Sequence, residues 1–167
     1  TAIFKFTSAG LELNFAAKGK VPGHLLNQFS LDEYADHLRV ATTSVRTTQN
    51  NVYVMDAGLN IVGKVENIAP GERIYAARFM GKRGYLVTFL QVDPLFALDL
   101  SDPQNPHIVG ALKIPGFSTY LHPIDEDHLL GIGRDTHVIE HKDQQGRVVS
   151  TQVLEAGIKL AIFDVGD

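Results

Sequence analysis

Short runs of alternating hydrophobic and polar residues follow one another along the whole chain. Typical runs are LELNFAAKGK (11–20), NVYVMD (51–56), LFALDL (95–100) and PHIVGALKI (106–114). A period of two, with many β-branched and aromatic residues and with Gly, Asp, Asn and Pro at the borders, predicts short β-strands. Helical spacing is almost absent, so the pattern predicts an all-β protein.

The strand-like runs recur in units of similar length. Pro-Gly pairs mark the units, and their prolines, Pro22, Pro70 and Pro115, lie 48 and 45 residues apart (70 − 22 and 115 − 70). A period of about 45 residues with four strands is typical of a β-propeller blade. Proline fixes φ and glycine permits a positive φ, so the pair suits a sharp step from the outer strand of one blade to the inner strand of the next.

This period divides the chain into two complete blades with a partial blade on either side. We predict a partial blade over residues 1–20, complete blades over residues 21–68 and 69–114, and a partial blade over residues 115–167. In the second complete blade, strands are expected over residues 73–79, 85–89, 95–100 and 107–113. Some twenty extra residues, about 136–155, predict a hairpin that is inserted into the last blade and turns at Asp143–Gly146.

Composition and charge narrow the classes of function. Hydrophobic residues make up 44% of the chain and charged residues 20%, as in ordinary globular proteins. The net charge of −4 argues against a nucleic-acid partner, and no apolar run approaches the roughly 18 residues that span a bilayer. Without cysteine the chain cannot form disulfides or a thiolate site. Because it starts at Thr1 within a strand-like run, we expect a piece of a longer protein.

Four long segments carry a resemblance to a known family. They are KGKVPGHLLNQFSLDEYADHLRVATT, ERIYAARFMGKRGYLVTF, VDPLFALDLSDPQNPHIVGALKIPGFSTYLHPIDEDHLLGIG and KLAIFDVGD. They resemble secreted bacterial and archaeal proteins with a C-terminal β-propeller domain, which is distantly related to WD40 repeats. The resemblance implies an exported or cell-envelope protein with a propeller larger than this chain. It carries over no catalytic residue.

The strongest polar cluster is YLHPIDEDHLL, which holds His122, Asp125, Glu126, Asp127 and His128. Carboxylates suit calcium and histidines suit zinc or another transition metal, so four of these residues are candidate metal ligands: His122, Asp125, Asp127 and His128. The same residues also suit a plain hairpin turn, since Asp is a good turn former. The corresponding turns LDEYAD and MGKRG share no common ligand set, so a ring of equivalent metal sites is not expected.

Catalytic motifs are absent from the sequence. GFSTY (116–120) lacks the second glycine of a nucleophile elbow, and GIGRDT (131–136) does not lead into a helix as a phosphate loop would. HVIEH (137–141) spaces two histidines for a helix, but on a strand they lie about 13 Å apart. No catalytic residue and no cofactor is therefore predicted, apart from the possible divalent metal.

Two hypotheses of function follow from the sequence. The favoured one is a non-catalytic scaffold or recognition module, secreted or in the cell envelope, that binds a protein or polymer through rim loops or the inserted hairpin. The alternative is a metal-dependent hydrolase or oxidoreductase with its site in the propeller channel or at the turn between His122 and His128. Open sheet edges at the two ends further predict that the chain can self-associate.

Overall fold

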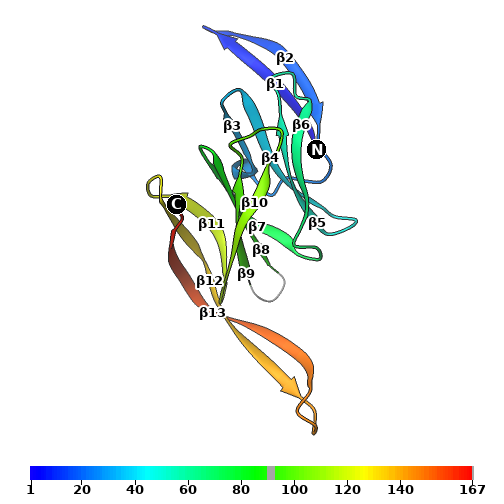
Figure 1. Ribbon diagram of the computed structural model, residues 1–167, viewed down its shortest axis with the longest axis vertical. Helices are drawn as coiled ribbons and strands as arrows, with labels where there is room; N and C mark the ends of the chain where they lie inside the picture. Colours follow the sequence, from blue (N-terminus) through cyan, green and yellow to red (C-terminus); the bar gives the residue numbers. More distant parts are fainter. Residues whose placement is uncertain (90–92, 167) are drawn as a thin grey trace.

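A computed structural model of the chain describes residues 1–89 and 93–166, and these residues form antiparallel β-sheets with one short 3-10 helix (Figure 1). The prediction of an all-β protein with four-stranded antiparallel sheets is confirmed. The elements are β1 (Ala2–Ala9), β2 (Glu12–Lys20), η1 (Gln28–Ser30), β3 (Leu31–Tyr34), β4 (His37–Ser44), β5 (Gln49–Met55), β6 (Ile61–Ile68), β7 (Arg73–Met80), β8 (Arg83–Phe89), β9 (Asp93–Asp99), β10 (His107–Ile114), β11 (Phe117–Pro123), β12 (His128–Lys142) and β13 (Val148–Asp164).

The strands form four sheets in chain order. Two of them have four strands each, in the orders β3-β4-β5-β6 and β7-β8-β9-β10. The third sheet has the order β11-β12-β13, and β1 and β2 form a separate hairpin. Short turns join nearly all neighbouring strands, as is usual for antiparallel meanders. The strands expected between residues 73 and 113 lie within a few residues of β7 to β10, whereas the exact blade boundaries remain a prediction.

Each Pro-Gly pair joins one sheet to the next. Gly23, Gly71 and Gly116 have φ angles of 85°, 89° and 78°, so the predicted positive φ of these glycines is confirmed. The step before β7 is also fixed by hydrogen bonds, because the side-chain amide of Asn50 donates to the carbonyls of Ile68 and Glu72, each at 3.0 Å. The chain is thereby held in place where it crosses from one sheet to the next.

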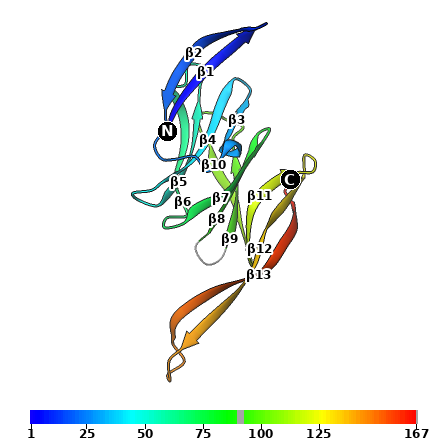
Figure 2. The same cartoon turned by 180° about the vertical axis from the view of Figure 1, so that it is seen from behind.

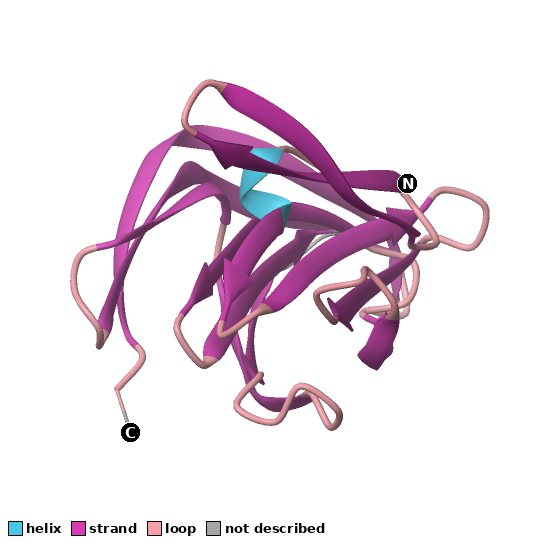
Figure 3. Cartoon of the chain, turned by 90° about the horizontal axis from the view of Figure 1, so that it is seen from above, coloured by secondary structure: helices cyan, strands magenta, loops and turns pink. Residues whose placement is uncertain are grey.

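The hydrophobic core lies between neighbouring sheets. Val52 and Ile68 of the first four-stranded sheet pack with Leu86 and Leu98 of the second. On the other face of that second sheet, a separate cluster joins it to the third sheet: Ala76, Tyr85, Val87, Leu95, Leu121, Leu129 and Phe163. The sheets therefore pack face to face, as blades do, and the side chains between them hold the chain together. Figure 3 shows η1 among the strands when the molecule is seen from above.

Two arginines link the sheets in addition to the apolar contacts. Arg39 on β4 donates from Nη1 to the carbonyl of Gly81 at 2.5 Å, in the turn of the next sheet. Arg78 on β7 donates from Nε to the carbonyl of Leu121 on β11 at 2.9 Å. Each arginine thus satisfies a main-chain acceptor of the following sheet.

The extra residues of the last sheet form a hairpin that is continuous with strands of that sheet. Strands β12 and β13 run on past the sheet as one ladder, with a bulge between Asp135 and Thr136. They end in a turn in which the amide of Gly146 donates to the carbonyl of Asp143 at 2.9 Å, at the position expected from the sequence. We call residues 136–155 the projecting hairpin, since Figures 1 and 2 show it extending away from the sheets.

Candidate functional site

The acidic turn (residues 124–127) joins β11 to β12 and holds two of the four predicted metal ligands, Asp125 and Asp127. Asp125 accepts hydrogen bonds from the amide of Asp127 at 2.9 Å and from Nδ1 of His128 at 2.8 Å. The hydrogen bond from His128, followed by that from the Asp127 amide, lowers the pKa of Asp125, and the same Asp125 carboxylate raises the pKa of His128. Asp125 therefore serves as a turn residue and pairs with one histidine.

His122 lies apart from this pair. Its Nδ1 is 3.1 Å from the hydroxyl of Tyr120, two residues away on β11, and the two rings are 6.0 Å apart. The structure thus brings Asp125 together with His128 but places His122 beside an aromatic residue. Over residues 1–89 and 93–166, no group of three or more His, Asp or Glu side chains is arranged to hold a metal ion. The metal site at His122, Asp125, Asp127 and His128 stays a prediction.

A junction of aromatic rings and an arginine lies close to this region, and the sequence analysis did not single it out. The guanidinium of Arg78 lies 4.4 Å from the ring centroid of Phe29 and 5.5 Å from that of Tyr120. Phe29 belongs to η1 and Tyr120 to β11, and their ring centroids are 5.4 Å apart. The helix η1 and two sheets are therefore joined by the cation–π contacts of Arg78, which also hold the Tyr120 ring beside His122.

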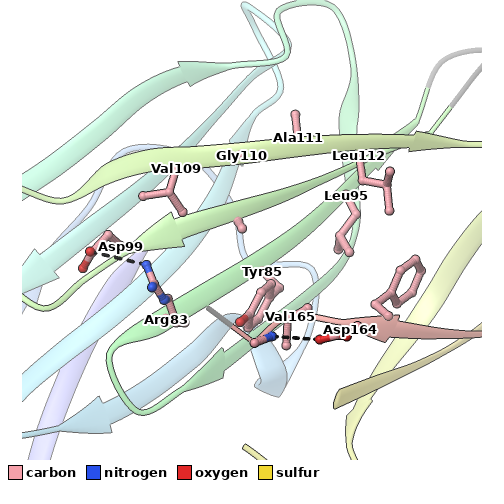
Figure 4. Close-up of a pocket in the computed structure, with 13 residues that line it drawn as sticks. Arg83, Tyr85, Leu95, Asp99, Val109, Gly110, Ala111, Leu112, Asp164 and Val165 are labelled. Atoms are coloured by element: carbon pink, nitrogen blue, oxygen red, sulfur yellow. Dashed lines mark hydrogen bonds and ion pairs between the residues drawn. The ribbon is translucent and has the colours of Figure 1, made fainter. Parts of the chain in front are cut away.

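A large open space lies between the second four-stranded sheet and the end of β13. This inter-sheet cleft has a volume of about 630 Å³, and Figure 4 shows its lining side chains. Tyr85, Leu95 and Phe163 form its apolar floor, and residues 109–112 of β10 form one wall. A cleft of this size with an apolar floor and few polar groups is a common form of binding site.

Charged groups lie at one end of the cleft. Nη1 of Arg83 is 3.4 Å from the carboxylate of Asp99. Hydrogen bonds from the side chain and the amide of Ser101 lower the pKa of Asp99, with a further contribution from Arg83. On the opposite wall, Asp164 accepts a hydrogen bond from the amide of Gly166 at 3.2 Å. The cleft lining thus combines apolar side chains with both signs of charge.

The projecting hairpin forms a second surface with binding character. Five large apolar side chains on it are exposed: Val138, Ile139, Val148, Val149 and Leu154. Charged residues stand between them, and Arg147 pairs with Asp143 at 2.8 Å beside the turn. Exposed apolar groups that gather on one projecting element are typical of interaction surfaces.

Face-to-face antiparallel sheets, linked by Pro-Gly steps at a period of about 45 residues, define a β-propeller type of protein. The chain belongs to the beta propeller domain family, because the sequence model of this family matches residues 1–167. Over residues 1–89 and 93–166, no helix has the length and apolar character needed to cross a membrane.

Two relatives come from archaea. An uncharacterized protein of Archaeoglobus fulgidus is 49% identical over 167 residues, which are 100% of this chain and 23% of that protein. An uncharacterized protein of Methanocaldococcus jannaschii is 54% identical over 122 residues, which are 70% of this chain and 20% of that protein. The chain thus spans about a quarter or less of the length of these relatives.

Proposed function

We propose that the chain is a non-catalytic recognition module of an exported or cell-envelope protein and that it binds a protein or polymer partner. The observation that carries this proposal is the projecting hairpin, which presents apolar side chains to solvent away from the core. The export of the protein is supported only by the family resemblance of the sequence.

The hairpin has apolar groups on both of its faces. Val138 pairs with Val153 across the ladder, and His137 pairs with Leu154. Paired residues share a face and successive pairs alternate, so these two pairs place apolar side chains on opposite faces. A two-stranded ribbon is marginally stable in water by itself. A partner that covers one or both faces would bury this apolar surface and stabilise the ribbon.

A shortened hairpin tests the proposal. Residues 138–153 are replaced by Asn-Gly, so that His137 and Leu154 remain paired across a two-residue type I′ turn. The thermal midpoint should stay within a few degrees, because the buried Thr136 is kept and no core residue is removed. Partner capture is followed with a photo-crosslinking amino acid at Leu154, which both forms retain, introduced into the full-length protein in its host.

The expected result is a defined crosslinked product with the complete hairpin and its loss with the shortened form. A matched crosslinker at Val45, an exposed residue in the β4–β5 turn, controls for non-specific capture. An equal yield of the same product from Val45, or from the shortened form, would place the binding surface elsewhere and contradict the proposal.

The metal-dependent alternative has one supporting observation, the direct contact between Asp125 and His128. Elemental analysis of protein purified without chelator tests it. One metal ion per chain that is lost in Asp125→Asn and His128→Ala variants would favour the metal enzyme. Equal metal content in the variants and the parent protein would exclude a specific site at the acidic turn.

A further inference from the structure

A glycine on the fourth strand of the first four-stranded sheet is in very close contact with the next sheet. A Cβ at Gly63 on β6 would lie 2.1 Å from the carbonyl oxygen of Pro103 and 2.8 Å from Cδ of Pro106. Both prolines belong to the turn that joins β9 to β10. The turn between the third and fourth strands of one sheet is therefore seated on a glycine of the preceding sheet.

Gly110 on β10 is the counterpart of Gly63. Both are the last residue of an Ile-Val-Gly sequence. Gly63 pairs with Val54 and Gly110 pairs with Ala97, and each of these partners lies two residues before an aspartate, Asp56 or Asp99. Yet a Cβ at Gly110 would meet nothing within 4 Å. We call the space above such a glycine, where the turn of the next sheet rests on Gly63, a turn seat. The same turn seat is present at Gly110 on β10, where it is empty and opens into the inter-sheet cleft.

The strand that borders the other side of the cleft has an open edge. Both β5 and β9 are third strands that pair with the second and the fourth strand of their sheets, whereas β13 pairs only with β12 among the described strands. The sequence Phe-Asp-Val at 163–165 matches Leu-Asp-Leu at 98–100. Asp99 leads directly into the turn that rests on Gly63. Asp164 corresponds to Asp99, so a turn that followed Asp164 in the same way would rest on Gly110.

We propose that the inter-sheet cleft is the seat of a fourth strand and of the proline-containing turn before it. This strand would pair with the edge of β13, and its turn would rest on Gly110. We assign it to a further stretch of the same polypeptide, with the sequence character of Ser101–Ile114. The inference is independent of the proposed partner binding by the projecting hairpin.

Two observations support this occupant over a separate molecule, and a third supports a strand as the occupant. In both four-stranded sheets, the fourth strand follows the third after a short turn, as consecutive antiparallel strands usually do. The chain spans 23% of the length of the Archaeoglobus fulgidus relative, so proteins of this family have residues available for a further strand. The apolar floor of the cleft suits an alternating strand, whose main chain would form hydrogen bonds along the open edge.

An extended form of the chain tests the inference. The sequence PQNPHIVGALKI, a copy of residues 103–114, is appended after Asp167, where it continues the match of 164–167 with 99–102. We expect the amides of residues 158–164 that point away from β12 to gain at least tenfold protection from hydrogen exchange, together with a thermal midpoint several degrees higher. An extension of the same composition in scrambled order should give neither change.

Substitutions at Gly110 show whether the seat is used. Gly110→Val in the unextended chain should leave the thermal midpoint within about 2 °C, because the position is on a strand and faces open space. In the extended chain the same substitution should remove the added protection, and Gly110→Ala should reduce it. Gly157→Val is the matched control, since Gly157 also faces open space on a strand but lies outside the cleft.

Each outcome bears on the inference. A monomeric extended chain with protection that depends on Gly110 supports it. A dimer in sedimentation analysis, with the same protection, would identify a second copy as the donor of the strand and overturn the assignment to the same polypeptide. An extension that leaves residues 158–164 unprotected, or protection that Gly110→Val does not change, would overturn the seat itself.

Discussion

The ion pair between the buried Arg39 and the partly exposed Asp32 tests how the first four-stranded sheet is stabilised. The two residues face each other across β3 and β4, and Nη2 of Arg39 donates to the carboxylate of Asp32. The side chain of Arg39 is only 3% exposed, whereas that of Asp32 is 36% exposed. We compare Asp32→Asn, which removes the negative charge, with Arg39→Met, which removes the buried positive charge.

Asp32→Asn is expected to cost more, although it changes the more exposed residue. It leaves a buried cation without its counter-charge, which costs about 3–5 kcal/mol for a fully buried pair. Water that reaches Asp32 weakens the pair, so about 2–3 kcal/mol is the better value. Nε of Arg39 already lacks a partner among the described residues, so the cation has little to compensate the loss.

Arg39→Met loses the hydrogen bond to Gly81 and the contacts with the rings of Tyr34 and Phe79. These losses amount to about 2 kcal/mol. The substitution also removes the desolvation cost of the buried guanidinium, and the methionine keeps an apolar side chain in its place. These two gains offset about half of the loss of about 2 kcal/mol. The expected net cost of Arg39→Met is therefore about 1 kcal/mol.

Thermal unfolding by circular dichroism distinguishes the two variants. At about 2–4 °C per kcal/mol for a chain of this size, Asp32→Asn should lower the midpoint by about 4–12 °C and Arg39→Met by about 2–4 °C. Glu33→Gln is the control, because Glu33 pairs with Lys5 at 2.7 Å in an exposed position and should contribute less than about 1 kcal/mol. A larger loss for Arg39→Met than for Asp32→Asn would refute the reasoning.

Three further predictions follow from single positions. In an NMR titration the pKa of His128 should lie above 6.5, and it should fall in the Asp125→Asn variant. The pair stabilises the fold only while His128 is protonated and Asp125 is ionised. Its contribution should therefore be lost as the pH rises through the raised pKa of His128, and also as the pH falls through the lowered pKa of Asp125. Leu129→Ala should cost about 3 kcal/mol in urea unfolding because Leu129 is 0% exposed, whereas Leu160→Ala at 66% exposure should cost less than about 0.5 kcal/mol. Gly71→Ala should cost about 1–2 kcal/mol from its φ of 89° alone, since no atom lies within 4 Å, and an unchanged urea midpoint would contradict this.

The sequence was sufficient for the fold because its strongest signals are local. Alternation over a few residues reports which face of a strand is apolar, and the Pro-Gly pairs fix the conformation of the backbone at the steps between sheets. Both signals act within about ten residues, so no knowledge of distant contacts was needed to place β7 to β10. The expected turn at Asp143–Gly146 was found for the same reason.

The candidate sites were harder to predict because they depend on distances between sheets. His122 and Asp125 are three residues apart in sequence, yet β11 directs one toward Tyr120 and the turn directs the other toward His128. The contact of Arg78 with Phe29 joins residues nearly fifty positions apart, and no local pattern marks it. Ordinary alternation likewise could not show that the added residues near Thr136 extend an existing ladder.

Apolar residues at matching positions of the alternating pattern are buried in one sheet and exposed in another. This difference in burial indicates which faces of the sheets lack a covering surface. Val54 lies two residues before Asp56, and Ile162 lies two residues before Asp164, so Val54 and Ile162 occupy matching positions. Val54 is 1% exposed, whereas Ile162 is 67% exposed. A sequence selected for burial at such a position implies a surface that covers it in the functional protein. Phe4 and Phe6 on β1, at the other end of the chain, are exposed in the same way. We therefore expect both end faces to be covered in the functional protein, by neighbouring blades or by another copy. This expectation concerns the packing faces and is separate from the open edge that the inter-sheet cleft presents.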